Sequence, residues 1–473
     1  MSYSTAYLAR NKHDLETLAL AAKSVNGVAA RVFFQLEPSE RRKSTSGWGP
    51  GHLVTLNLIT ESLEKDSLTV LDHEAAHSEC PWCNRNIRRD SSLQELDMAY
   101  SEELLGNGPV GYQQMTDAEL LKNWRTGHFW SALAKATRTE ADHRQESRPQ
   151  RPRTQCIRPG YVDSRTAIPD SSSSPSAMDR LPEQEDQEMA SSPAPAKATS
   201  PPGSSIPDTW LSSSPTGLGS SSAFAPSFGD VNEDDFMDRS GLPEQTTVHL
   251  FMTFLQCITS CCLIQDINSL VQKFHTGPQT IRKLDIQARW DRRRSYAHLG
   301  ESITIAGEDD GGLSAVALIG NTWRVTDPHI ILFEGKKAGG ESYYDDERKQ
   351  LVAPISEKRL AQYLGEAITA WNASDGSDNH IFVMAATNTL IRFIDFMFGN
   401  DYDSYLKAEN TQQQLELVND DRKDVCVYMN TTRPFCIEKP ADRQAVFCIV
   451  LSILRRWQSR LQRDYDANMD SSD

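Results

Sequence analysis

The sequence lacks a long apolar run and a recognisable leader segment. Its first residues do not combine a basic stretch with an apolar core, so we expect no secretory signal. The most apolar segment, His249 to Ile264, is too short to span a bilayer and includes polar residues such as Gln256. We therefore expect a buried helix there, no membrane partner, and an intracellular protein of the nucleus or cytoplasm.

Several motifs of common enzyme classes are also missing. Gly311-Gly312 and Gly339-Gly340 are isolated pairs without the surrounding pattern of a phosphate-binding glycine loop. There is no Gly-x-Ser-x-Gly nucleophile motif and no repeat at a fixed period. These absences argue against nucleotide-dependent enzymes, serine hydrolases of the α/β class and repeat architectures.

Apolar residues are scarce, and basic residues are outnumbered. Hydrophobic residues make up 38% of 473 and the mean hydropathy is -0.53, which predicts a long segment without a packed core. The formal net charge of -16 argues against a generally basic surface for nucleic acid. Contact with phosphate would have to come from a local patch, and the densest one contains Arg289, Arg292, Arg293 and Arg294.

Cysteine is present in an odd number, nine, without a leader segment. This combination fits a reducing compartment, where disulfides are rare. The adjacent pair Cys261-Cys262 falls in the apolar helix, where packed thiols are expected.

Composition divides the chain into four parts. Residues 141–244 are rich in serine and proline and have few large apolar residues in periodic positions, so we expect a disordered linker. Within it, residues 224–236 combine three phenylalanines with acids, a pattern that suits docking to a protein partner. On either side we expect an N-terminal region, 1–140, and a C-terminal domain, 245–465, followed by a short disordered tail, 466–473.

The N-terminal region contains a segment with metal-ligand spacing. Cys80 and Cys83 have the two-residue separation that lets two thiolates bind one tetrahedral zinc ion, and His73 and His77 could complete the site. A second interpretation reads His73-Glu74-x-x-His77 as a zinc protease motif with Glu74 as the general base. A third reads the two cysteines as a redox dithiol.

The most informative pattern is an apolar run that ends on an acid and a lysine. Ile330-Ile331-Leu332-Phe333 precede Glu334-Gly335-Lys336, and residues two apart on a strand share a face. If the run is a strand, Glu334 and Lys336 emerge together at its end. Upstream, the acidic pair Asp309-Asp310 follows a β-prone stretch, and a helix expected from Ser356 carries Gln362. Carboxylates brought together from neighbouring strands can bind a hard divalent cation.

This order of elements resembles the PD-(D/E)XK nuclease superfamily, with its restriction-endonuclease-like fold, and in particular nuclease-like domains found in many fungal proteins. The order is a strand with an acid, a strand with Glu-x-Lys, a helix with Gln362 and two further strands near 380–384 and 390–394. The resemblance implies an α/β fold, a mixed sheet flanked by helices, beside a small, mainly helical N-terminal region.

The resemblance also implies a reaction and a set of residues. Asp309 or Asp310 would be the first metal ligand, Glu334 the second and Lys336 the catalytic lysine, while Gln362 would match a helix glutamine near the metal. Asp327, followed by Pro328, is a second choice for the first acid. The expected function is Mg²⁺-dependent hydrolysis of phosphodiester bonds in DNA or RNA. The alternative is an inactive nuclease-like fold that binds protein or nucleic-acid partners.

Overall fold

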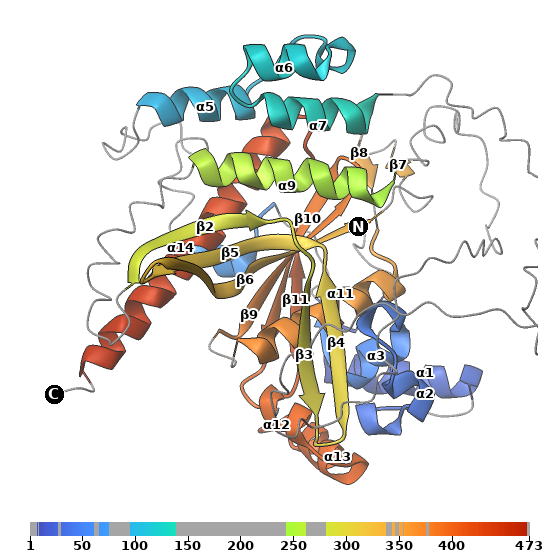
Figure 1. Cartoon of the computed structure of the whole chain (residues 1–473). Helices are drawn as coiled ribbons and strands as arrows, with labels where there is room; N and C mark the ends of the chain where they lie inside the picture. Colours follow the sequence, from blue (N-terminus) through green and yellow to red (C-terminus); the bar gives the residue numbers. More distant parts are fainter. Residues whose placement is uncertain are drawn as a thin grey trace, which may run out of the picture. The chain divides into compact units, whose positions relative to one another are not determined.

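The computed structural model describes residues 7–138 and 243–470, except 8, 27–29, 61–65, 75–94, 262–280, 337–342, 346–349, 353 and 375–377. Residues 1–140 and 232–473 belong to one compact unit, which contains every described element. Figure 1 shows a central sheet in this unit with helices on both of its faces. The described part of the chain is therefore an α/β protein, as the sequence predicts.

The main sheet has eight strands of mixed direction. Its order is β1-β11-β10-β9-β6-β5-β2, with β12 also pairing with β10. β6 runs parallel to β9 and antiparallel to β5, so the sheet is mixed at its centre. The strands are β1 (Leu58–Thr60), β2 (Ile281–Arg289), β5 (Gly311–Ile319), β6 (Thr322–Lys336), β9 (His380–Thr387), β10 (Leu390–Phe398), β11 (Val427–Thr431) and β12 (Phe435–Cys436).

Two smaller ladders accompany the main sheet. β3 (Arg293–Leu299) and β4 (Ile303–Asp309) form an antiparallel ribbon, which packs against helix α11 (Glu357–Ala373). β7 (Tyr343–Asp345) and β8 (Gln350–Val352) form a short second pair. Because Asp310 alone separates the end of β4 from the start of β5, the chain leaves the ribbon and enters the main sheet at this residue.

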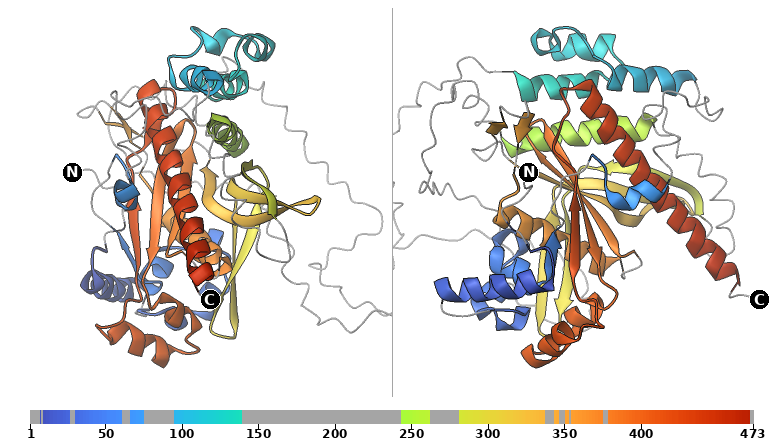
Figure 2. Two further views of the ribbon diagram at one scale, coloured as in Figure 1. Left: turned by 90° about the vertical axis from the view of Figure 1, so that its left-hand side faces the viewer. Right: turned by 180° about the vertical axis from the view of Figure 1, so that it is seen from behind.

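Each face of the main sheet has its own hydrophobic core. One core joins the sheet to α5 (Glu95–Leu105), α6 (Asp117–Asn123), α7 (Gly127–Thr137), α9 (Glu244–Cys261) and α14 (Pro440–Asp470). The other joins it to α1 (Lys12–Asn26), α3 (Pro50–Thr55), α11, α12 (Tyr402–Lys407) and α13 (Thr411–Asn419), near the short α2 (Pro38–Arg41). Figure 2 shows α14 crossing the back of the sheet as one long helix.

The N-terminal part of the chain contributes directly to this unit. β1 lies at one edge of the sheet and pairs in parallel with β11, so that Leu58 is opposite Val427. α7 packs against α9, with Phe129 and Phe254 4.9 Å apart between ring centroids. The regions before and after the serine- and proline-rich segment thus share one sheet and its two cores.

Local signals that the sequence contains appear where they are expected. Thr116 caps α6 in a reciprocal capping box with Glu119, and the Ser356 side chain caps α11 by accepting from Arg359 N–H. The apolar segment near 249–261 is the buried helix α9. None of the described helices combines the length and the apolar composition needed to span a membrane.

Candidate functional site

Glu334 and Lys336 lie together at the end of β6. The preceding residues Ile330 to Phe333 are almost completely buried, and burial of each such side chain contributes roughly 1.5–3 kcal/mol. Leu332 packs in the core beneath α11, so residues two and four further along face the same helix. The Lys336 ammonium donates a hydrogen bond to Glu334 Oε1 within an ion pair. The apolar run therefore fixes the acid and the lysine on the α11 face.

Helix α11 adds an amide and a second acid to this pair. Gln362 Nε2 lies 2.6 Å from Glu334 Oε1 and 2.8 Å from Glu366 Oε1, so one amide joins the two carboxylates. Residues four apart lie on the same side of a helix, which places Gln362 and Glu366 toward the sheet together. We name Asp310, Glu334, Lys336, Gln362 and Glu366 the Glu334 cluster.

Two carboxylate oxygens in the Glu334 cluster have no hydrogen-bond partner. They are Glu334 Oε2 and Glu366 Oε2, both fully buried, in side chains that are 3% exposed or less. Burial raises the pKa of Glu334 to about 8; Lys336 opposes this and the charge of Asp310 adds to it. Burial also raises the pKa of Glu366 well above its ordinary value, with the charge of Glu334 acting in the same direction. A buried unpartnered carboxylate oxygen is unfavourable unless it binds a proton or a cation.

Lys336 supplies the positive charge of the cluster. Burial alone would lower its pKa, but the charge of Glu334 and their hydrogen bond outweigh burial and raise the pKa above the usual range of lysine. The ammonium therefore stays protonated beside the two acids.

The structure separates the adjacent acids Asp309 and Asp310. Asp309 is held by both terminal nitrogens of Arg289, at 2.9 and 2.7 Å, and also accepts from the backbone of Arg293 and Gly311. Asp310 instead accepts from Gly335 N–H at 3.1 Å, beside Glu334, and its charge acts on Glu334. Asp310 is therefore the acid that joins Glu334, and Asp309 fastens the ribbon to β2.

The glycines that follow Asp310 allow this approach. Gly312 has φ of +143°, and a Cβ there would lie 2.0 Å from the carbonyl oxygen of Ile331 on β6. Gly335 is required for a different reason: a Cβ added there would lie 2.8 Å from the side chain of Val248 of α9, on the opposite face of the sheet. Gly312 thus lets two strand backbones come close, and Gly335 lets the Val248 side chain approach the backbone of β6.

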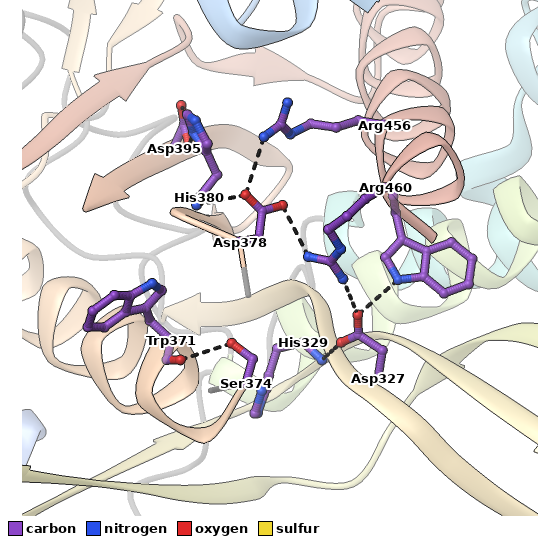
Figure 3. Close-up of polar contacts among 10 residues, drawn as sticks. Asp327, His329, Trp371, Ser374, Asp378, His380, Asp395, Arg456 and Arg460 are labelled. Atoms are coloured by element: carbon purple, nitrogen blue, oxygen red, sulfur yellow. Dashed lines mark hydrogen bonds and ion pairs between the residues drawn. The ribbon is translucent and has the colours of Figure 1, made fainter. Parts of the chain in front are cut away.

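Asp327 lies in another cluster, beside α14 (Figure 3). Its carboxylate accepts from Trp457 Nε1 at 2.9 Å and from Arg460 at 2.7 Å. Arg460 also binds Asp378 at 3.1 Å, and Arg456 binds Asp378 at 3.2 Å. We name Asp327, Asp378, Arg456 and Arg460 the Asp378 cluster. Asp327 is thus occupied by contacts in the Asp378 cluster. Of the three acids that the sequence offered as the first acid, Asp310 is the one that lies beside Glu334.

The arginines of the expected basic patch are mostly paired with acids. Arg289 binds Asp309, and Arg294 binds Glu308 at 2.8 Å. Arg292 lies 2.9 Å from Asp310 and 3.7 Å from Glu244, with its side chain 55% exposed. The patch therefore borders the Glu334 cluster through Arg292, and its contact with phosphate stays a prediction.

The residues expected to bind zinc fall largely outside the described part of the chain. His77, Cys80 and Cys83 are not described, and for His73 only the backbone is. Within the described ranges no group of three or more His, Cys, Asp or Glu side chains converges on one point. The zinc site and the linker residues 224–236 remain predictions.

Glu366 is the member of the Glu334 cluster that the sequence motifs did not indicate. Its only signal is an acid inside the apolar stretch Leu364 to Ile368, four residues after Gln362 on the same helix. A charge on the buried side of an amphipathic helix departs from the usual pattern and could have identified it.

Comparison with protein-family models gives no match for this chain, and comparison with curated proteins gives none either. What is established is a mixed α/β sheet in the C-terminal region, packed against helices and completed by an N-terminal strand.

Proposed function

We propose that the Glu334 cluster is the active site of a metal-dependent nuclease of the PD-(D/E)XK kind. The observation that carries the proposal is the pair of buried carboxylates, Glu334 and Glu366, each with an unpartnered oxygen beside Lys336. The positions of Asp310, Glu334, Lys336 and Gln362 also agree with the resemblance drawn from the sequence.

The residues present fit a magnesium ion. Mg²⁺ keeps several waters and is usually held by one or two protein carboxylates together with phosphate oxygens of the substrate. The free oxygens of Glu334 and Glu366 supply such carboxylates. A dedicated all-protein group of ligands is not needed for this metal.

Each side chain then has a defined task. When bound, Mg²⁺ would lower the pKa of a coordinated water and offset charge on the phosphate. Gln362 holds both carboxylates in place through its amide. Lys336, protonated and 17% exposed, can donate to a phosphate oxygen or orient the attacking water.

The test is cleavage by the full-length chain. We expect Mg²⁺-dependent hydrolysis of labelled single- or double-stranded DNA or RNA that is lost on chelation. Glu334→Gln keeps the shape of the side chain but removes the carboxylate, so activity should fall at least about 100-fold, beyond the effect of losing a residue that only orients a ligand.

Glu308→Gln is the matched control, because Glu308 is an exposed acid on β4 paired with Arg294 outside the cluster. Its cleavage rate should equal that of the unaltered chain. Equal activity in the Glu334→Gln and Glu308→Gln variants would contradict this active site.

A second candidate is an interaction module that keeps the nuclease fold without cleavage. The ion pair between Arg292 and Asp310 favours it, since it neutralises an acid that the reaction would use. Binding of nucleic acid with no hydrolysis under any divalent cation would support this candidate.

A further inference from the structure

A cleft lies beside the Glu334 cluster, between the start of α11 and strands β9 and β10. Strand register gives its position: on the α11 face of the sheet, Ala385 of β9 is opposite Glu334, and Thr387 is opposite Lys336. Both Ala385 and Thr387 line the cleft. Adjacent strands are about 4.8 Å apart, so the cleft begins one strand spacing from the acid and the lysine.

The lining of the cleft is mainly apolar. Of the ten described residues that line it, none is acidic and six are apolar: Pro354, Ile355, Ala385, Leu390, Ile391 and Pro434. Sites for small organic groups commonly combine apolar walls with a few polar groups that orient the ligand. The two arginines of the lining, Arg359 and Arg392, both have interaction partners within the protein. The remaining polar groups are the hydroxyls of Tyr363 and Thr387.

The Tyr363 hydroxyl is a donor without a partner. Tyr363 is 3% exposed, and its hydroxyl makes no hydrogen bond to the described residues. Burial raises the pKa of Tyr363 above the usual range of tyrosine, and Lys336 is the charge that acts on it most strongly. The hydroxyl therefore stays protonated close to Lys336. A buried donor that is not hydrogen-bonded is unfavourable, so its place in the wall of a cleft indicates a ligand.

Further donors lie on the same side of the cleft. The half-buried Thr387 hydroxyl also makes no hydrogen bond to the described part of the chain. Lys336 donates one hydrogen bond to Glu334, and an ammonium carries three N–H groups. Leu390 and Ile391 belong to β10, one strand further from the cluster. The free donors thus lie nearest to Lys336, and apolar side chains of β10 lie beyond them.

We propose that this cleft binds the nucleoside of the nucleotide whose phosphate binds at the Glu334 cluster. The inference rests on the proposed function, because it assigns the part of the substrate next to the phosphate that is cleaved. Apolar side chains contact the base, and the hydroxyls of Tyr363 and Thr387 bond to its polar edge or to the sugar. A base inside a duplex must leave its stack and its partner to reach such a site, so the preferred substrate is a single strand.

Binding without cleavage tests the cleft separately from catalysis. The full chain carrying Glu334→Gln is titrated in Ca²⁺ with a fluorescent oligonucleotide, as a single strand and as a duplex, and anisotropy is recorded. The single strand should bind at least about tenfold more tightly. Tyr363→Phe in this background should weaken single-strand binding about fivefold, and Thr387→Val should act alike. Because the Tyr363 hydroxyl has no partner in the free protein, the thermal unfolding midpoint of Tyr363→Phe should stay or rise.

Tyr296→Phe is the matched control, since Tyr296 is a tyrosine of β3 that is 49% exposed and does not line the cleft. It should change affinity less than twofold. Equal affinities for Tyr363→Phe and Tyr296→Phe, or a duplex bound as tightly as the single strand, overturn the inference. A Tyr363→Phe protein that is less stable but binds normally gives the hydroxyl a structural role and overturns it too.

Monophosphates test whether the cleft recognises the base. They are measured as competitors of the fluorescent single strand in the same background. A nucleoside monophosphate should compete at least about fivefold better than ribose 5-phosphate, which lacks the base, and Tyr363→Phe should reduce this difference. Equal competition by the two removes the inference. Comparison of the 5′- and 3′-monophosphates assigns the side of the cleaved bond that the nucleoside occupies.

These results are distinguishable from a failure of the proposed function. Cleavage that requires Glu334, alongside unchanged binding in Tyr363→Phe, leaves the nuclease proposal standing and removes this one. Base-dependent binding that requires Tyr363, without any cleavage by the unaltered chain, does the reverse.

Discussion

The Glu334 cluster and the Asp378 cluster border the same sheet, but their buried carboxylates differ in how completely they are hydrogen-bonded. Beside α14, two aspartates meet two arginines, and both carboxylates receive hydrogen bonds from more than one donor (Figure 3). Beneath α11, the two glutamates share the amide of Gln362, Glu334 also pairs with the ammonium of Lys336, and each glutamate retains an unpartnered oxygen.

This difference distinguishes a structural network from a candidate site. Buried carboxylates that are paired with arginines hold elements together, here the long helix α14 and the sheet. Buried carboxylates that remain incompletely paired store unfavourable energy, which a cation or a proton can relieve. Substitutions in the two clusters should therefore have opposite consequences.

The largest effect is expected on stability, from the Asp378 cluster. Asp378→Ala removes a partner of both Arg456 and Arg460, whose side chains are 16% and 19% exposed. Leaving buried charges without this carboxylate should lower the free energy of unfolding by about 3 kcal/mol, measured by denaturant titration. The cleavage that we propose for the Glu334 cluster should not change per folded molecule.

The control for this substitution is Asp420→Ala. Asp420 pairs with Arg422, which is 89% exposed, and exposed ion pairs contribute little to stability. If Asp378→Ala were no more destabilising than Asp420→Ala, the Asp378 cluster would not hold α14 to the sheet.

The next prediction, at Glu366, is the opposite: a gain of stability together with a loss of activity. Glu366→Gln keeps the contact with Gln362 but removes a buried carboxylate whose pKa is raised, so the protein should become more stable at alkaline pH. Mg²⁺-dependent cleavage should fall by about 100-fold. Thermal unfolding and cleavage rates on the same preparation check both. Loss of stability together with full activity would assign Glu366 to structure alone.

The last prediction concerns pH. Glu334 holds its proton up to about pH 8 in the folded protein, against an ordinary value of 4.5, so the metal-free protein should lose stability as pH rises through this window. Binding Mg²⁺ must release the proton, so affinity should rise about tenfold per pH unit below 8 and then level off. Calorimetry in buffers of different ionisation enthalpy counts the protons released. An affinity that stays constant between pH 6 and 8 would contradict this coupling.

Local patterns predicted much of the C-terminal fold. The apolar runs ending at Lys336 and beginning at His380 and Leu390 are strands, and Ser356 does cap the helix that carries Gln362. These features depend on neighbours in sequence, so periodicity and capping chemistry suffice to find them.

Long-range contacts explain what the sequence left open. Asp309 and Asp310 have the same chemistry, and only the change from ribbon to sheet between them decides which one meets Gly335. Likewise, the register of β6, β9 and β10 places Arg392 opposite Ala385, which is itself opposite Glu334. Neither relation is encoded in spacing along the chain.

The parallel pairing of β1 with β11 has a consequence for how the chain folds during synthesis. β11 is made some 370 residues after β1, so the N-terminal strand has no partner until nearly the whole chain has been translated. A fragment starting near residue 243 would lack β1 and leave one edge of β11 open to pairing with other molecules. Co-expression of the two fragments should therefore yield soluble protein where the C-terminal fragment alone aggregates.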